Sequence, residues 1–237
     1  MHYLTLIFLW PIYLVQAIWV KRTTIKLPEP SGKRVNASCR SPQLSLLILG
    51  DSAAAGVGVS HQQQALAGNM VKRLSNDYQL NWQLVAQSGY STQNCLNKVK
   101  LMTHQNQLTK ADVIVISLGV NDVLSPISAK TWILQLSELC ALITSKLGGT
   151  QIIITNVPPM DRFPALPQPF RWFLGARSRE FNLALSNWVQ TSSLPCEQLN
   201  MELTLADAPM AIDGFHPSEV IYAHWGQQAC DMIKVKA

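Results

Sequence analysis

Residues 46–52 read Leu-Leu-Ile-Leu-Gly-Asp-Ser, and this run decides the fold class. Its four apolar residues predict a buried strand, and Gly50 and Asp51 are residue types that turn the chain where a strand ends. Such a turn places the Ser52 hydroxyl at the carboxyl edge of a sheet, where α/β folds hold their active sites. We expect Asp51 to cap the turn that follows. By itself, the run fits either a reactive serine or an ordinary turn.

Apolar strands alternate with helical segments along the rest of the chain. Strands are expected at residues 44–49, 82–86, 113–118, 151–156 and 197–203. Helices are expected at residues 62–76, 92–107, 128–147, 176–191 and 219–235. Continuous apolar strands separated by amphipathic helices predict a parallel sheet that is covered on both faces. The sequence therefore predicts a three-layer α/β/α, flavodoxin-like fold of about five parallel strands, preceded by an N-terminal apolar helix.

The N-terminal part of the chain differs in composition from the rest. Residues 3–20 carry no charged side chain and are just long enough to span a bilayer. We expect residues 1–20 to form a hydrophobic membrane anchor or signal-like segment, residues 21–42 a basic Pro/Gly linker, and residues 43–237 one folded domain. Basic residues follow the apolar run, which favours a retained anchor in a bacterial inner membrane with the domain on the cytoplasmic side. The alternatives are a cleaved signal, giving a periplasmic or secreted protein, and a peripheral or buried helix.

The positive charge is concentrated in one segment. The 237 residues carry a net charge of +5, and residues 21–40 hold six basic side chains and one acidic one. The 13 basic and 13 acidic groups of residues 41–237 balance each other, which argues against a nucleic-acid partner. The five cysteines are widely spaced and form no Cys-x-x-Cys pair, so neither a disulfide framework nor a zinc site is indicated. No metal or cofactor is predicted.

Four short motifs fall where expected strands end or where the last helix begins. They are Gly-Asp-Ser at residues 50–52, Gln-Ser-Gly-Tyr-Ser at 87–91, Gly-Val-Asn-Asp at 119–122 and Asp-Gly-Phe-His-Pro at 213–217. In this order and spacing, the motifs resemble those of the SGNH (GDSL-type) hydrolase superfamily, and the resemblance covers about residues 44–232. Residues 50–54 read Gly-Asp-Ser-Ala-Ala, so the Gly-x-Ser-x-Gly elbow of α/β-hydrolases is absent.

The resemblance implies a role for each motif. Ser52 would be the nucleophile, His216 the base that takes its proton, and Asp213 the carboxylate that orients the imidazole. The backbone N–H groups of Ser52 and Gly89 and the side-chain amide of Asn121 would form the oxyanion hole. Glycine at position 89 would let the backbone approach the substrate closely.

One long irregular segment, at residues 158–175, is rich in proline and aromatic side chains. Long loops in compact domains often have a function, and this one carries four candidate substrate-binding residues: Phe163, Leu166, Phe170 and Trp172. They would form an acyl-binding wall or a membrane-facing lid. The alternative is a covering loop that packs on the core.

The resemblance implies a serine esterase that hydrolyses carboxylic esters through an acyl-serine intermediate. The expected membrane contact through residues 3–20 suggests lipid or lysophospholipid-like esters as one substrate class, with small-molecule esters as another. Two alternatives stay open. The same site would also serve an acyltransferase or a thioesterase, and a chain that kept only the fold would be a non-catalytic, membrane-associated scaffold.

Overall fold

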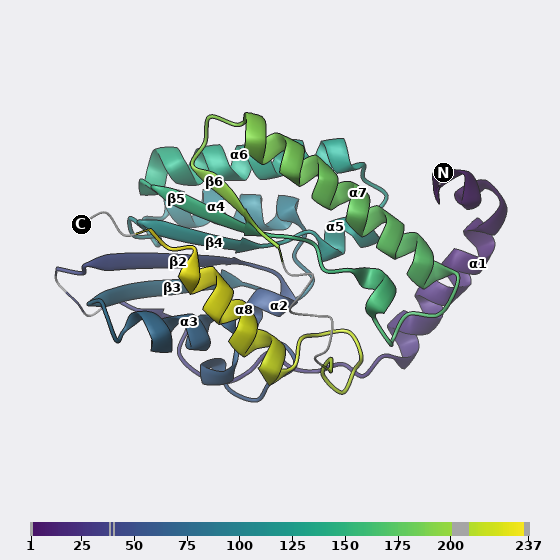
Figure 1. Ribbon diagram of the computed structural model, residues 1–237, viewed down its shortest axis with the longest axis horizontal. Coiled ribbons are helices and arrows are strands. Elements are labelled where there is room, and N and C mark those ends of the chain that lie inside the picture. Colours follow the sequence, from purple (N-terminus) through teal and green to yellow (C-terminus); the bar gives the residue numbers. More distant parts are fainter. Residues whose placement is uncertain (1, 38, 40, 201–208, 235–237) are drawn as a thin grey trace.

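The computed structural model describes residues 2–37, 39, 41–200 and 209–234. These residues fold around one sheet of six strands, whose arrangement can be followed in Figure 1. The strand order is β1-β3-β2-β4-β5-β6. The bounds are β1 Val35–Asn36, β2 Leu44–Gly50, β3 Leu80–Ala86, β4 Val113–Ser117, β5 Gln151–Thr155 and β6 Cys196–Leu199. Neighbouring strands from β3 to β6 are parallel, and the short β1 runs antiparallel to β3. The expected sheet of about five parallel strands is confirmed, and β1 adds an edge that the sequence did not predict.

Helices cover both faces of the sheet (Figure 1). The bounds are α2 Ser52–Ala55, α3 Leu66–Leu74, α4 Thr92–His104, α5 Val120–Leu124, α6 Ala129–Leu147, α7 Phe170–Thr191 and α8 Glu219–Asp231. Side chains alternate between two apolar cores, because successive strand residues point to opposite faces. Ile48 and Val115 pack with α3 and α8, whereas Leu49 and Ile116 pack with α4, α6 and α7. The three-layer architecture is therefore the one expected.

Two segments differ from the sequence expectation. The irregular segment is shorter than residues 158–175, because it includes a short 3₁₀ helix, Met160–Arg162, and because α7 begins at Phe170. No proline follows Pro169 in this region, so nothing prevents a helix from starting there. The helix expected over residues 62–76 is interrupted at Ala65, which separates the 3₁₀ helix Gln62–Gln64 from α3.

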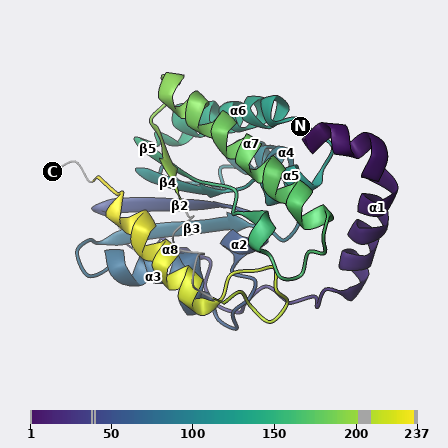
Figure 2. The ribbon, with the colours of Figure 1, turned by 45° about the vertical axis from the view of Figure 1, so that its right-hand side comes forward.

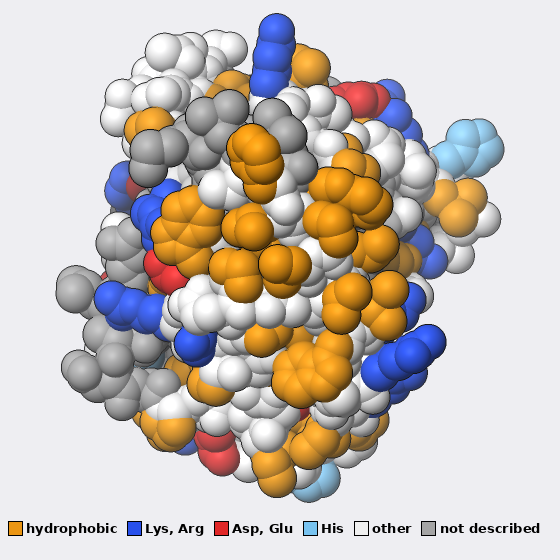
Figure 3. Space-filling model, turned by 90° about the vertical axis from the view of Figure 1, so that its right-hand side faces the viewer, with side chains coloured by type: hydrophobic (Ala, Val, Ile, Leu, Met, Phe, Trp, Pro, Cys, Tyr) orange, Lys and Arg blue, Asp and Glu red, His pale blue; other side chains and the backbone are white. Residues whose placement is uncertain are grey.

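The N-terminal helix α1, His2–Thr23, packs against the start of α7 (Figure 2). Tyr13 is buried and its ring stacks on Phe173 at a centroid distance of 4.8 Å. The Gln16 side chain donates to the Gln168 carbonyl at 2.6 Å and accepts the Phe170 N–H at 3.0 Å. Apolar side chains also gather on the surface at this end of the molecule (Figure 3).

The sequence predicts a membrane-spanning helix over residues 3–20, and the structure does not support this prediction. Among the residues described, no helix is both long and apolar enough to cross a membrane. The segment expected as a linker also packs on the domain. Pro30 is buried and lies where a Cβ on Gly56 would contact it, and β1 pairs with β3.

Candidate active site

The turn between β2 and α2 positions Ser52 at the carboxyl edge of the sheet. The Asp51 N–H donates to the Ser117 carbonyl at 3.1 Å, and the Asp51 carboxylate accepts the Ala53 N–H at 3.0 Å. Asp51 therefore caps α2, as expected. Glycine is required at position 50, because a Cβ there would lie 2.4 Å from the Ala54 Cβ and 2.5 Å from the Ser117 oxygen.

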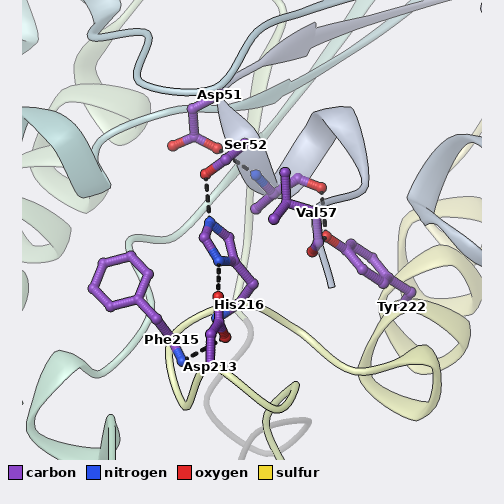
Figure 4. Close-up of polar contacts among 8 residues, drawn as sticks. Asp51, Ser52, Val57, Asp213, Phe215, His216 and Tyr222 are labelled. Carbon is purple, nitrogen blue, oxygen red and sulfur yellow. Dashed lines mark hydrogen bonds and ion pairs between the residues drawn. The ribbon is translucent and has the colours of Figure 1, made fainter. Parts of the chain in front are cut away.

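Helix α8 contacts α2 and the residues that follow it through Tyr222. The Tyr222 hydroxyl lies 2.9 Å from the Ala53 carbonyl oxygen and 2.7 Å from the Val57 carbonyl oxygen (Figure 4). Tyr222 is fully buried, and burial raises the pKa of its phenol well above the ordinary value. The hydroxyl thus stays protonated and available as a donor, so the backbone after Ser52 is fixed by a buried contact.

A continuous chain of hydrogen bonds joins Ser52, His216 and Asp213 (Figure 4). His216 Nε2 lies 2.9 Å from Ser52 Oγ, and His216 Nδ1 lies 2.5 Å from Asp213 Oδ2. The second carboxylate oxygen, Oδ1, accepts the backbone N–H groups of Phe215 and His216, each at 3.0 Å. One tight turn therefore orients both Asp213 and His216 toward Ser52.

The environment keeps Asp213 ionised. Burial by itself raises the pKa of Asp213, but hydrogen bonds from the His216 side chain and from the two backbone N–H groups outweigh it and lower the pKa overall. An ionised carboxylate on Nδ1 selects the tautomer of His216 that leaves Nε2 free to accept a proton from Ser52. The arrangement is the one that nucleophilic catalysis by serine requires.

Asp51 has a different electrostatic environment, although it is adjacent to Ser52. Burial raises the pKa of Asp51 to about 7; the Ala53 N–H and nearby His216 oppose this shift, and Asp122 adds to it. Asp122 is itself buried and accepts the N–H and the hydroxyl of Thr92, at 3.0 Å and 2.9 Å to its Oδ2. Both carboxyl groups support the loops around the site.

The loops that follow β3 and β4 flank Ser52, because Gly50 pairs with Ala86 on one side and with Ser117 on the other. Gly89 lies in the first loop with φ at +85°, is exposed, and has open space where a Cβ would be. Asn121 lies in the first turn of α5, after the second loop, and its side-chain amide donates to the Tyr90 carbonyl at 2.9 Å. This bond ties the two loops together and leaves one amide hydrogen of Asn121 for another acceptor.

Glu29 is a residue of this site that the sequence did not reveal. Its Oε1 accepts hydrogen bonds from the N–H and the hydroxyl of Ser88, at 2.7 Å and 2.8 Å. Its Oε2 accepts a hydrogen bond from the Arg34 guanidinium at 2.6 Å. Arg34 also donates to the Ala86 carbonyl at 2.9 Å. Burial raises the pKa of Glu29, but the Ser88 hydrogen bonds and Arg34 outweigh it, so the pKa is lowered. A carboxylate from the N-terminal segment therefore anchors the residue that precedes Gly89.

A narrow pocket of about 60 Å³ opens beside Ser52 and His216. Of the four candidate substrate-binding residues, only Phe163 lines it, packing edge-on against Phe215 with ring centroids 5.1 Å apart. Leu166 and Phe170 are buried in the core, and Trp172 is 38% exposed; none of the three lines this pocket. The expectation of an acyl-binding wall is therefore wrong for these three residues: Leu166 and Phe170 pack in the core, and Trp172 lies at the surface. Within the described ranges, no group of three or more His, Cys, Asp or Glu residues is placed to hold a metal ion.

Comparisons with known proteins identify the family of the chain and structures that share its fold. The model of the GDSL-like lipase/acylhydrolase family matches residues 48–224. No curated protein matches the chain. Similar solved structures include a lipolytic protein of the G-D-S-L family from Veillonella parvula, 18% identical with a TM-score of 0.64, covering 80% of this chain and 97% of that chain.

The esterase EstA from a Pseudoalteromonas species is 16% identical with a TM-score of 0.59, covering 79% of this chain and 94% of that chain. At these identities the two structures show that the fold is shared. The match to the family model covers most of the chain, and the matched range contains Ser52, Gly89, Asn121 and His216. The chain therefore belongs to the GDSL-like lipase/acylhydrolase family.

Proposed function

We propose that the protein is a serine esterase that cleaves carboxylic esters through an acyl intermediate on Ser52. One observation carries this proposal: the unbroken hydrogen-bonded chain from Ser52 Oγ through His216 to the buried Asp213. Membership of a lipase/acylhydrolase family supports ester hydrolysis as the general reaction.

In the first half-reaction, His216 Nε2 takes the Ser52 proton while Oγ forms a bond to the ester carbonyl carbon. The tetrahedral intermediate collapses when the carbon–oxygen bond to the alcohol breaks, and the imidazolium returns its proton to the leaving oxygen. In the second half-reaction, His216 takes a proton from water as the water oxygen attacks the acyl carbon. The bond between this carbon and Ser52 Oγ then breaks, the imidazolium returns its proton to Oγ, and the carboxylic acid is released. Asp213 stabilises the imidazolium in both steps.

The negative charge on the carbonyl oxygen needs hydrogen-bond donors. The positions of the two flanking loops support the N–H groups of Ser52 and Gly89 and the free amide hydrogen of Asn121 in this role. The small volume of the pocket favours short acyl groups over long-chain lipids.

The proposal is tested with the full chain and p-nitrophenyl esters from acetyl to decanoyl. We expect Ser52→Ala to lower kcat by at least about 10⁴-fold. Ser145→Ala, which alters an exposed serine on α6, is the matched control and should leave kcat unchanged. Equal activity of Ser52→Ala and the wild type would contradict the proposal. Adding a competing alcohol and measuring the free acid against the new ester separates hydrolysis from acyl transfer.

A further inference from the structure

The outward side of α1 is exposed and apolar. The inward side packs against the start of α7 through Tyr13 and Gln16, and three further side chains on it contact the same core: Leu9, Ala17 and Val20. Every exposed residue from position 8 to position 19 is apolar: Phe8, Trp10, Pro11, Ile12, Leu14, Val15, Ile18 and Trp19. A surface helix ordinarily presents polar side chains to water, so a continuous apolar face of this kind marks a contact with a membrane or another molecule.

Helix α1 lies at the end of the molecule that carries the candidate active site. Figures 1 and 2 show it beside the start of α7, at the end where β2 runs into α2 and Ser52. The first turn of α7 adds Trp172, which is 38% exposed. Figure 3 looks onto this end, where apolar side chains gather and Lys and Arg side chains lie around them. A surface that covers α1 would therefore approach the end that carries Ser52.

Positive charges follow directly after the apolar face. Lys21 and Arg22 lie in the last turn of α1, Lys26 comes soon after, and all three are exposed. Residues 1–28 contain no Asp or Glu, and within the described part of the chain no carboxylate forms an ion pair with these three side chains. Exposed tryptophan beside aliphatic side chains and unpaired cations is the composition of helices that lie on anionic membranes.

A second copy of the chain is a poorer match for this face. In a symmetric contact through α1, each copy would present the same residues, and residues 1–28 of neither copy would offer an acidic side chain to the cations of the other. Like charges placed together oppose association. A lipid surface supplies both missing parts, since its phosphates are anionic and its acyl chains are apolar.

We propose that α1 docks the protein on an anionic lipid surface. The helix lies along the boundary between headgroups and acyl chains, with its outward face in the acyl chains and with Lys21, Arg22 and Lys26 on the lipid phosphates. It does not span the bilayer, because Tyr13 and Gln16 keep its inward side packed on the domain. Docking requires no esterase activity, so binding alone tests it.

Sedimentation of the full chain with lipid vesicles is the first test. We expect binding to vesicles of phosphatidylcholine mixed with phosphatidylglycerol, weaker binding to phosphatidylcholine alone, and loss of binding as salt screens the charges. Leu14→Glu should lower the partition coefficient by about tenfold, because it removes an apolar side chain from the lipid. Leu134→Glu is the matched control, since Leu134 is exposed on α6, and it should bind as the wild type does.

The cations are tested separately, with a variant that leaves the apolar face intact. Lys21→Gln combined with Arg22→Gln should lower binding to the anionic vesicles by about tenfold and leave binding to phosphatidylcholine unchanged. Lys130→Gln combined with Lys146→Gln removes two exposed cations from α6 and is the control. The proposal is overturned if the wild type does not bind anionic vesicles, if it binds both kinds of vesicle equally, or if the α1 variants bind as their controls do.

Tryptophan fluorescence and the oligomeric state separate the remaining arrangements. Lipids brominated near the headgroup should quench the fluorescence more than lipids brominated near the chain ends, and Trp10→Phe combined with Trp19→Phe should lose most of this quenching. Stronger quenching from the chain ends would show a spanning helix and overturn the proposal. Sedimentation velocity without lipid should give a monomer. A dimer that Leu14→Glu dissociates would show that a second copy covers this face, and would also overturn it.

Discussion

The Glu29 carboxylate accepts two hydrogen bonds from Ser88, one from its backbone N–H at 2.7 Å and one from its hydroxyl at 2.8 Å. Glu29 lies in the segment before β1, whereas Ser88 directly precedes Gly89 in the loop after β3. The N-terminal segment therefore contributes to the position of a proposed oxyanion donor, and it is more than a tether.

Glu29→Ala should lower kcat by about tenfold with little change in KM, because the Gly89 N–H is loosened but still present, whereas complete loss of a donor costs about 10²–10³-fold. Glu29→Gln keeps an acceptor oxygen and should retain most of the activity. Glu138→Ala on α6 removes an exposed ion pair with Lys100 of α4 and serves as the control. If kcat of Glu29→Ala equals that of Glu138→Ala, the loop does not depend on this contact.

Asn121→Ala should lower kcat by about 10²–10³-fold, because it removes a donor to the oxyanion and also the bond to the Tyr90 carbonyl. Steady-state kinetics on one short ester gives the value, and thermal unfolding checks that the variant folds. Asn97→Ala is the control, since Asn97 is exposed and its side chain contacts Gln93 on the same helix. A fall in kcat below tenfold would remove Asn121 from the proposed oxyanion hole.

Asp51→Asn should change how stability depends on pH. Burial raises the pKa of Asp51 from its ordinary 3.8 to about 7 in the folded protein, so the folded state binds this proton more tightly than the unfolded state. The contribution of Asp51 to the unfolding free energy of the wild type should therefore fall as pH rises from about 4 to about 7. Asparagine keeps the acceptor for the Ala53 N–H but does not titrate.

As pH rises from about 4 to about 7, Asp51→Asn should therefore gain unfolding free energy relative to the wild type. Above this range the difference between the two proteins should stay constant. Urea unfolding at several pH values measures this difference. Two parallel curves would show that the Asp51 carboxyl has an ordinary pKa in the folded state.

Local patterns are sufficient to predict the sheet and the residues that meet at its edge. A parallel sheet brings the ends of its strands together, so motifs that follow β2, β3 and β4 had to converge. The spacing of Asp213 and His216 fits a single turn, which the structure contains as the two bonds from backbone N–H groups to Asp213.

Features that depend on long-range packing could not be predicted in this way. Glu29 is 59 residues from Ser88, and no pattern in the sequence pairs a linker carboxylate with a distant loop. The uncharged run at residues 3–20 predicts a membrane span. Composition alone does not show that Tyr13 and Gln16 contact residues at the start of α7. The aromatic residues near Phe170 were assigned to the substrate for the same reason, since apolar side chains that cover a core and those that line a pocket look alike in sequence.

The most direct test of the central claim is covalent labelling of Ser52. The full chain is treated with a p-nitrophenyl alkylphosphonate, which transfers its phosphonyl group to an activated serine, and the labelled residue is identified by mass spectrometry of peptides. The account predicts one adduct, on Ser52, that forms in step with the loss of esterase activity and is strongly reduced in His216→Ala. Complete inactivation with the adduct on another residue, or full activity remaining after Ser52 is labelled, would contradict it.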